Sequence, residues 1–490
     1  MKPKRPISLM LLAIVLASTT LPSCGGESDV QESGTTDTTQ QAAETNALTG
    51  SGLEVRDWGG KTFNVMTSKP GSDGHSFRNF EVYATEENGD IVNDAVYRRN
   101  MTLETLLNVN ITETPIPTEL TGGDIRQAVL AGDQMYDLAF ARSYEVGQLA
   151  LEGNLYDMNQ LEYVDYTKDW WDKLVIENAE VEGKLFFASS AFDLHAKKRT
   201  YMLLYNTDLA VKYQIGNIAD TVREGKWTID KQIEYVKLVS SDLNGDSKMD
   251  LDDQYGLVLG DMKDLQYYFV AAGGKIAKKD ENGKIQLTMN NDRTIQLIDK
   301  YLKMSGPDYT VSPSRFKSYD DSYAVFWRGH ALFYDGILSS VESASSRANF
   351  DYKALPLPKL DEEQRQYYTM MDNIGLLFCV PVNAPDPEFT GYMLEALSYV
   401  SDSTTLPTYY EKCCKIKSVY DEDSAEMIDI AMSGQICDIG FLYNIGGLAS
   451  ILNSDIPSGT KNTFMSRYAA REEKAKQNIA DIYEKLNELS

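Results

Sequence analysis

The chain has 490 residues, which is too long for one ordinary hydrophobic core and predicts two domains. Its 47 basic and 73 acidic side chains give a formal net charge of −26. Such a surface repels phosphate backbones, so nucleic acid is not expected as a partner. The mean hydropathy of −0.36 excludes a protein with many membrane spans.

Residues 1–23 have the pattern of a secretory signal peptide. A basic start precedes an apolar stretch, Leu9–Ala17, which is too short to span about 30 Å of hydrocarbon comfortably. The stretch Leu21–Cys24 resembles a bacterial lipobox, in which the cysteine becomes the acylated first residue of the mature chain. We therefore expect Cys24 to be lipidated; the alternative is a plain signal peptide followed by a chance cysteine.

Residues 24–58 are expected to be this cysteine and a flexible acidic tether. From Gly25 to Val55 the chain has no Lys, Arg or aromatic residue and is rich in Ser, Thr, Gln, Glu and Asp. Such a segment cannot bury enough apolar surface to offset the entropy of ordering it. The tether would hold a folded body near a membrane.

Folding signals begin near Gly60. In chain order they predict strand 61–68, helix 93–109 capped by Asn93, strand 109–112, helix 124–131, strands 136–140, 184–188 and 199–205, helix 226–238 capped by Thr228, strand 331–333, an extended crossover at 354–358, strand 376–381 and one long helix over 464–489. Strands that alternate with helices predict an α/β fold with a largely parallel sheet.

No catalytic residue is predicted. The three histidines lie far apart, and the sequence has no HExxH, GxSxG, GxxxxGK[ST] or dinucleotide-binding pattern. A carboxylate pair for glycoside hydrolysis stays open, since 73 acidic side chains offer many pairs. The cysteines other than Cys24 are too few for a disulfide framework, and we expect Cys379, Cys413, Cys414 and Cys437 to be small buried hydrophobes.

An acidic stretch, 242–253, has the spacing of a calcium loop. Its expected ligands are the side chains of Asp242, Asn244, Asp246, Asp250 and Asp253 and the backbone carbonyl of Lys248. Two features depart from the pattern: Ser247 stands where glycine usually supplies a positive φ, and Asp253 is shorter than the usual Glu. A structural calcium ion is expected; a solvated acidic turn is the alternative.

The aromatic residues are the second indication of a binding site. Tyrosine, whose ring carries a polar hydroxyl, outnumbers phenylalanine by 30 to 16. Several rings stand beside polar residues: Trp170 and Trp171 after an Asp, Trp327 before an Arg, Tyr334 before Asp335, and Tyr443 before Asn444. Carbohydrate recognition uses this combination, because apolar sugar faces stack on rings while hydroxyls take hydrogen bonds. Packing in the core is the alternative for each ring.

Stretches along the whole of residues 60–490 together resemble one family. They are YDLAFARSYEVGQLALEGNLYDMNQL (136–161), the WW pair (170–171), GKLFFASSAFDL (183–194), TYMLLYN (200–206), GKWTIDKQI (225–233), DLNGDSKMDLDDQYGL (242–257), FWRGHALFYDG (326–336), ALPLPKL (354–360) and YNIGGL (443–448). With the lipoprotein start, their order resembles the extracellular solute-binding proteins of ABC sugar importers, the family-one group that includes maltose-binding protein.

The resemblance implies a two-lobed α/β fold of the periplasmic-binding-protein type, with a hinge and a cleft between the lobes. Lobe one would comprise 59–192 with 360–405, and lobe two 193–359 with 406–490. The chain would cross between them near 188–204 and 355–359. A carbohydrate, either an oligosaccharide or a monosaccharide, would close the cleft and be delivered to a membrane permease. The protein would be a monomer, anchored by its lipid to the outer face of the cell membrane.

The cleft in such folds lies at strand ends and loops near the hinge. The resemblance therefore implies twelve ligand-binding residues: Arg142, Ser143, Tyr144, Trp170, Trp171, Trp327, Tyr334, Asp335, Asp372, Asn373, Tyr443 and Asn444. Three alternatives stay open: a surface enzyme acting on glycosides, a binding protein for a peptide or another polar solute, and a structural lipoprotein without a small ligand.

Overall fold

The computed structural model describes residues 46–68, 81–116, 122–260, 264–371, 375–415 and 422–489, all within one compact unit formed by residues 44–490. The predicted signal peptide, Cys24 and the first part of the tether lie outside the described residues. None of the helices in these ranges is long and apolar enough to cross a membrane.

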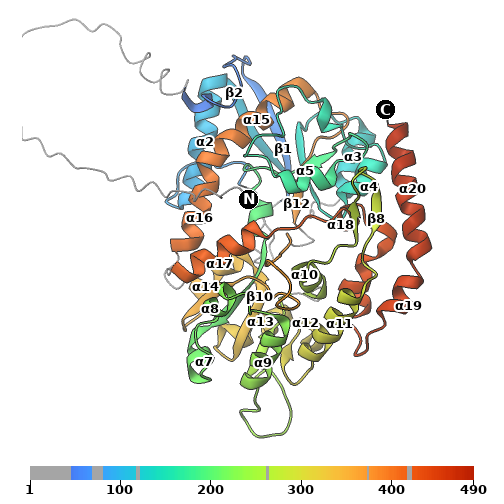
Figure 1. The fold of residues 1–490 in the computed structure, drawn as a ribbon. Helices are drawn as coiled ribbons and strands as arrows, with labels where there is room; N and C mark the ends of the chain where they lie inside the picture. Colours follow the sequence, from blue (N-terminus) through green and yellow to red (C-terminus); the bar gives the residue numbers. More distant parts are fainter. Residues whose placement is uncertain are drawn as a thin grey trace, which may run out of the picture. The chain divides into compact units, whose positions relative to one another are not determined.

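The first sheet has the strand order β2-β1-β3-β12-β4. Figure 1 labels β1, β2 and β12 of this sheet. Its strands are β1 (Lys61–Ser68), β2 (Val109–Ile116), β3 (Leu138–Arg142), β4 (Phe187–Ala188) and β12 (Leu376–Cys379). β1 pairs in parallel with β2 and β3, whereas β12 runs antiparallel to β3 and β4. β1, β2, β3 and β4 therefore run in one direction, which confirms the prediction of a largely parallel sheet. β12 is the exception, because it enters from the opposite direction after the chain has built the second sheet.

The second sheet has the order β11-β5-β10-β6-β9. Its strands are β5 (Tyr201–Asn206), β6 (Tyr255–Val258), β9 (Thr310–Val311), β10 (Ala331–Ile337) and β11 (Tyr352–Leu355). β6 is parallel to β9 and β10, and β5 is antiparallel to β10 and β11. Every residue of β5 is buried. Tyr201, Leu203 and Tyr205 enter the large core that also fills the first sheet, while Met202 and Leu204 enter a smaller core on the other face.

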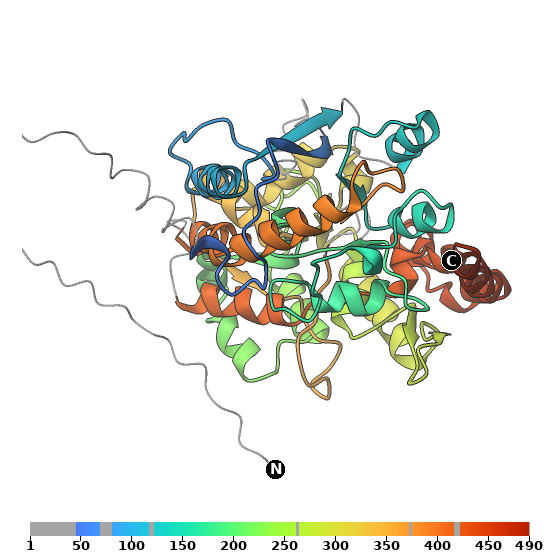
Figure 2. The same ribbon diagram turned by 90° about the horizontal axis from the view of Figure 1, so that it is seen from above.

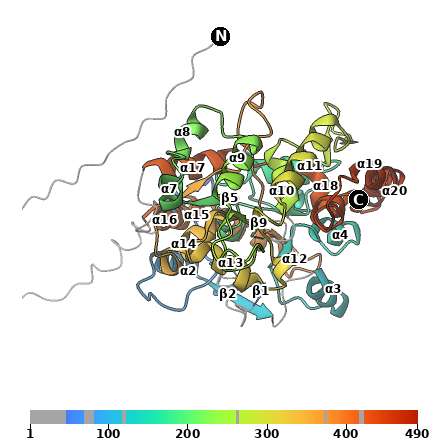
Figure 3. The ribbon, with the colours of Figure 1, turned by 90° about the horizontal axis from the view of Figure 1, so that it is seen from below.

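Helices cover both sheets, as the views from above and below show (Figures 2 and 3). The helices are α2 (Ile91–Leu107), α3 (Gly122–Ala131), α4 (Val146–Leu151), α5 (Lys173–Ala179), α6 (Leu194–Lys198), α7 (Thr207–Lys212), α8 (Ile218–Arg223), α9 (Ile229–Val239), α10 (Asp264–Ala271), α11 (Asp292–Met304), α12 (Pro313–Phe316), α13 (Tyr319–Trp327), α14 (Leu338–Arg347), α15 (Pro387–Ser403), α16 (Thr405–Lys415), α17 (Glu422–Ser433), α18 (Ile439–Leu442), α19 (Phe464–Ala469) and α20 (Glu472–Glu488). Short helical turns are η1 (Asn46–Leu48), η3 (Met158–Gln160), η4 (Ile445–Gly447) and η5 (Ile451–Asp455), and β7 (Ala277–Lys279) pairs with β8 (Ile285–Leu287) in a hairpin.

Two helix starts test the capping predictions. Thr228 is confirmed as the N-cap of α9, where its hydroxyl accepts the N–H of Lys231. Asn93 is not the cap of α2; Asp90 takes that place and accepts the N–H groups of Val92 and Asn93. The amide of Asn93 instead donates to the carbonyl of Glu86.

The predicted C-terminal helix is broken in two. Ala470 and Arg471 separate α19 from α20, and the guanidinium of Arg471 pairs with Asp455 at 2.8 Å. The periodicity continues through the break, so the sequence pattern did not reveal it. α20 buries Ala475, Ile482 and Leu486 against η4 and α4, next to the first sheet. Figures 2 and 3 show α20 at one edge of the unit.

The contact of α9 with β6 depends on Gly256. A Cβ at this position would lie 2.3 Å from the Cα and from the carbonyl oxygen of Val236, in the backbone of α9. Gly256→Ala therefore forces the helix away from the strand, and we expect the free energy of unfolding to fall by about 1–3 kcal/mol. Urea unfolding measures it. Gly306→Ala is the matched control, since its nearest neighbour outside the adjacent residues lies 3.5 Å away; an equal loss in both variants contradicts the explanation.

Candidate functional site

Three chain segments that pass between the two halves of the fold lie side by side. We call them the crossing segments: the first contains Thr200, the second is 369–371 and the third is 434–436. Thr200, before β5, forms a β-bridge with Met371, and Thr369 forms one with Gln435. The N–H of Tyr201 donates to the carbonyl of Met370 at 3.1 Å. The crossing segments therefore hold one another by backbone hydrogen bonds.

The first crossing falls within the predicted range, 188–204. The predicted second crossing, 355–359, lies at the start of the connection from β11 in the second sheet to β12 in the first. Lys359 bridges to Thr228 at the start of α9, and the indole of Trp227 donates to the carbonyl of Pro356 at 3.0 Å. Residues 355–359 therefore pack beside the second sheet. Further along the same connection, residues 369–371 meet the other two crossing segments.

Strand ends from both sheets reach this junction. At the end of β3, the N–H of Ser143 donates to the carbonyl of Gly375 at 2.9 Å. At the end of β10, the N–H of Leu338 donates to the carbonyl of Thr200 at 2.8 Å. In α/β proteins the crevice at the carboxyl ends of strands is the usual place for a ligand.

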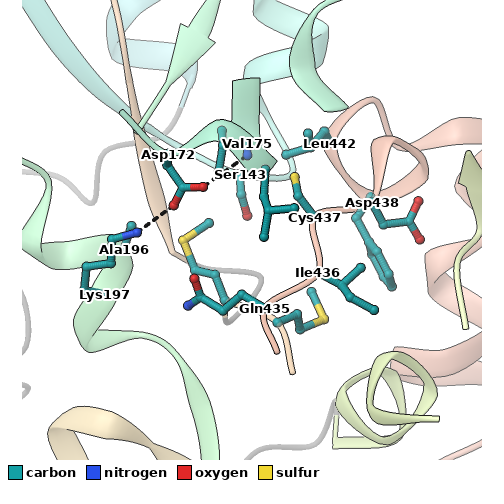
Figure 4. A pocket seen from close by; sticks show the side chains of 14 residues that line it. Ser143, Asp172, Val175, Ala196, Lys197, Gln435, Ile436, Cys437, Asp438 and Leu442 are labelled. Atoms are coloured by element: carbon teal, nitrogen blue, oxygen red, sulfur yellow. Dashed lines mark hydrogen bonds and ion pairs between the residues drawn. The ribbon is translucent and has the colours of Figure 1, made fainter. Parts of the chain in front are cut away.

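A small pocket opens to solvent at the same place, with a cavity volume of about 60 Å³ (Figure 4). Its walls come from the end of β3, from α5 and α6, from the second and third crossing segments and from α18. The lining residues are Ser143, Asp172, Leu174, Val175, Ala196, Lys197, Met370, Met371, Gln435, Ile436, Cys437, Asp438, Phe441 and Leu442.

An ion pair forms one wall of the pocket. Asp172 and Lys197 lie 2.6 Å apart, with 12% and 14% of their side chains exposed. Burial alone would raise the pKa of Asp172, but the charge and hydrogen bond of Lys197 bring it below its ordinary value. Burial likewise opposes the charged form of Lys197, yet Asp172 raises the pKa of the lysine overall. Both groups are therefore charged at neutral pH. Asp172 also caps α5 by accepting the N–H of Val175.

Three further titratable groups at this junction are altered by burial. Burial raises the pKa of Asp438 to about 6, although its carboxylate accepts backbone N–H groups from Ile276, Ala277 and Gly440. Burial raises the pKa of the Cys437 thiol, which stays protonated, and it raises the pKa of Asp193 to about 7. Asp193 caps α6 through the N–H of Ala196.

Of the twelve residues predicted to bind ligand, Ser143 lines this pocket. Its neighbours Arg142 and Tyr144 bond to each other, with the guanidinium donating to the phenol oxygen at 2.8 Å. Asp372 and Asn373 lie outside the described residues. Asn444 is exposed in a left-handed conformation, with φ 47°.

The tryptophan pair is packed inside the first half of the protein. The indole N–H groups of Trp170 and Trp171 donate to the two carboxylate oxygens of Glu395 at 3.0 and 2.9 Å. Trp171 is 3% exposed and lies edge-on to Tyr166 and Phe378. This placement matches the packing alternative for these rings.

The remaining predicted rings also contact other side chains of the protein. Tyr334 stacks on Phe326 in the smaller core, with Trp327 tilted against it at 5.1 Å, and Asp335 is fully buried beside them. Tyr443 is buried and donates to the carbonyl of Ala179 at 3.2 Å. Phe441 is the one aromatic residue among the pocket-lining residues that the structure describes.

Most lining residues were missed by the sequence reasoning. Asp172 directly follows the predicted tryptophan pair, so its position carried a usable signal. Lys197, Met370, Met371 and 435–438 come from connections without any pattern of composition or spacing. Only the pairing of the crossing segments brings them together.

The carboxylates of the acidic loop, 242–253, accept hydrogen bonds from backbone N–H groups of the same loop. Asp242 accepts the N–H groups of Gly245 and Ser247, and Asp253 accepts those of Leu243 and Asp250, at 2.6–2.8 Å. Ser247 has φ 62°, the positive value that a calcium loop needs at this position. Within the described ranges, no group of three or more His, Cys, Asp or Glu side chains is gathered closely enough to hold a metal ion by those side chains alone.

The side chains of Cys413 and Cys414 lie outside the described residues. Cys379 is buried, as expected, while Cys437 is partly exposed at the pocket; both are free thiols.

The raised pKa of Asp193 predicts a pH dependence of stability. Between the unfolded carboxyl pKa, about 3.9, and the folded value of about 7, the folded state keeps a proton that the unfolded state loses. Stability from this group is therefore full below pH 4 and is lost as pH rises through 7. Asp193→Asn keeps an oxygen for the cap and should flatten the fall in unfolding free energy between pH 5 and 8, measured by urea titration. Asp169→Asn is the control, since Asp169 is exposed and its pKa is lowered; an unchanged slope in Asp193→Asn rejects the assignment.

No protein-family model matches the sequence, and no curated protein matches it. Solved structures do match. The galacto-N-biose-/lacto-N-biose I-binding protein of the ABC transporter from Bifidobacterium longum, in complex with lacto-N-biose, is 13% identical with a TM-score of 0.59, over 87% of this chain and 98% of that chain.

Two further structures agree. The maltose/maltodextrin-binding domain from Bdellovibrio bacteriovorus, bound to maltotriose, is 15% identical with a TM-score of 0.53, over 87% of this chain and 100% of that chain. An ABC transporter solute-binding protein from Thermotoga lettingae, bound with α-D-tagatose, is 14% identical with a TM-score of 0.54, over 85% and 100%. The chain therefore has the two-lobed α/β fold of these solute-binding proteins.

Proposed function

We propose that this protein is the solute-binding component of an ABC importer and that it captures a carbohydrate by closing its two lobes. The observation that carries the proposal is the pocket at the crossing segments, where strand ends of both sheets meet in a fold shared with sugar-binding proteins. All three of the similar structures described above hold a sugar.

The pocket is suited to capture because its walls belong to different parts of the fold. α5 belongs to the first sheet's side, while 369–371 and 434–436 belong to the segments that pass between the sheets. A solute that touches both sides stabilises the closed arrangement by its higher affinity for that state. The backbone bonds between crossing segments let the two sides rotate without unfolding either sheet.

The lining favours binding over bond cleavage. A glycoside hydrolase needs two carboxyl groups that face the substrate, one as acid and one as base or nucleophile. Asp172 is paired with Lys197, and Asp438 is bound by three backbone N–H groups. Neither carboxylate is arranged to exchange protons with a solute, so the enzyme alternative is disfavoured.

The N-terminal sequence supports an exported, anchored protein. A cleaved signal peptide and lipidation at Cys24 would place the folded unit on the outer face of the cell membrane, with the acidic tether as spacer. There it would work as a monomer and deliver its solute to a membrane permease. Mass spectrometry of the membrane-extracted protein tests whether Cys24 carries acyl chains.

We expect a carbohydrate to stabilise the purified protein without being consumed. At about a hundredfold excess over Kd, a ligand that binds only the folded state adds about 2.7 kcal/mol to the free energy of unfolding. Thermal shift with a broad panel that includes maltotriose, lacto-N-biose and D-tagatose measures this.

Leu174→Trp, at the half-exposed pocket edge, should weaken binding at least about tenfold by filling the pocket. Leu130→Trp is the control, because Leu130 is 89% exposed on α3; a panel without any shift contradicts the proposal.

The acidic loop is proposed as a structural calcium site. The support is the alternation of oxygen donors over 242–253 and the positive φ of Ser247. Calcium should raise the melting temperature, and a chelator should lower it again, because the ion neutralises the clustered charge. Asp246→Asn removes one of those charges and should reduce the shift. Equal melting temperatures with calcium and with chelator would contradict the proposed calcium site.

A further inference from the structure

The polar side chains of the pocket are largely occupied by the protein itself. Asp172 bonds to Lys197 at 2.6 Å and to the N–H of Val175 at 3.2 Å. The amide of Gln435 donates to the hydroxyl of Thr200 at 2.6 Å. The carboxylate of Asp438 turns away from the open space in Figure 4, toward the backbone N–H groups that bind it. A hydroxyl group placed here would give up hydrogen bonds to water and regain few.

The rest of the wall is apolar on several sides. α5 gives Leu174 and Val175, α6 gives Ala196, the crossing segments give Met370, Met371 and Ile436, and α18 gives Phe441 and Leu442. Figure 4 shows Val175, Ile436 and Leu442 around the same open space. Since these residues come from separate elements, they enclose a guest and do not form a flat patch. The two methionines are flexible and can adjust to its shape.

These two observations select the chemistry of the guest. Burying apolar surface is favourable in proportion to its area, whereas burying an unpaired hydroxyl is costly. An unsubstituted sugar therefore gains little in this pocket, and an apolar group gains much. Ser143, at the end of β3, borders the pocket, so a polar part of the same molecule would lie toward this strand end.

We propose that the solute is a glycoside with an apolar aglycone, whose aglycone occupies this pocket while its sugar lies toward the strand ends. The inference rests on the proposed function, since it takes the pocket as part of the solute site. It names a substrate class that differs from a simple sugar.

The test compares free sugars with their 4-nitrophenyl glycosides, as matched pairs, by thermal shift and calorimetry on the purified protein. The aryl group buries an area like that of a core side chain, so the glycoside should bind about ten- to hundredfold more tightly than the free sugar. Leu174→Gln and Met371→Gln should bring this ratio toward one. Leu130→Gln, the same change on an exposed leucine outside the pocket, should leave the ratio as it is.

The outcomes separate the two claims. Equal affinity for a free sugar and its aryl glycoside overturns the apolar pocket and leaves the proposed function standing. A ratio that Leu130→Gln reduces as much as Leu174→Gln also overturns it. If neither free sugars nor aryl glycosides bind, the proposed function falls as well. Circular dichroism of each variant separates loss of folding from loss of binding.

Discussion

The pairing of the crossing segments is the constraint on which the site depends. Thr369 accepts the N–H of Ile436 through its carbonyl at 2.7 Å and donates its own N–H to Gly434 at 3.0 Å. Thr200 bonds to the amide of Gln435 through its hydroxyl. These contacts fix the register of three segments that are distant in sequence. Because the register is fixed, Met370, Met371 and Ile436 face the same space, and each sheet can hold its own shape on either side.

Two walls of the pocket, α5 and α18, are tied to the β7–β8 hairpin. Lys279, on β7, donates to the carbonyls of Glu177 and Glu180 at the end of α5. Asp438, before α18, accepts the N–H of Ile276 beside β7. The hairpin follows α10, which packs with α11 on the second sheet's side. The hairpin therefore links α5 and α18 to the second sheet's side of the fold.

Sequence reasoning found the parts of the fold that local signals encode. β1, β3 and β5 have the runs of apolar residues that mark buried strands, and Thr228 has the short polar side chain that starts a helix. The antiparallel entry of β12 had no such signal, because its direction is decided by where the second sheet ends. The site was harder still. Lys197 and Asp172 are opposite charges on separate helices, and no spacing in the chain shows that they meet.

The predicted aromatic residues make their contacts inside the protein. Trp170 and Trp171 place two indole donors on one buried carboxylate, and burial raises the pKa of Glu395 to about 7 while those bonds oppose the rise. Their polar atoms are thus satisfied within the protein, and the rings serve packing. None of these predicted rings lines the pocket, so under the proposed function a solute would be held there mainly by area and shape. Apart from Phe441, the apolar lining residues are aliphatic or thioether side chains without a preferred stacking plane, which is consistent with the proposed apolar aglycone.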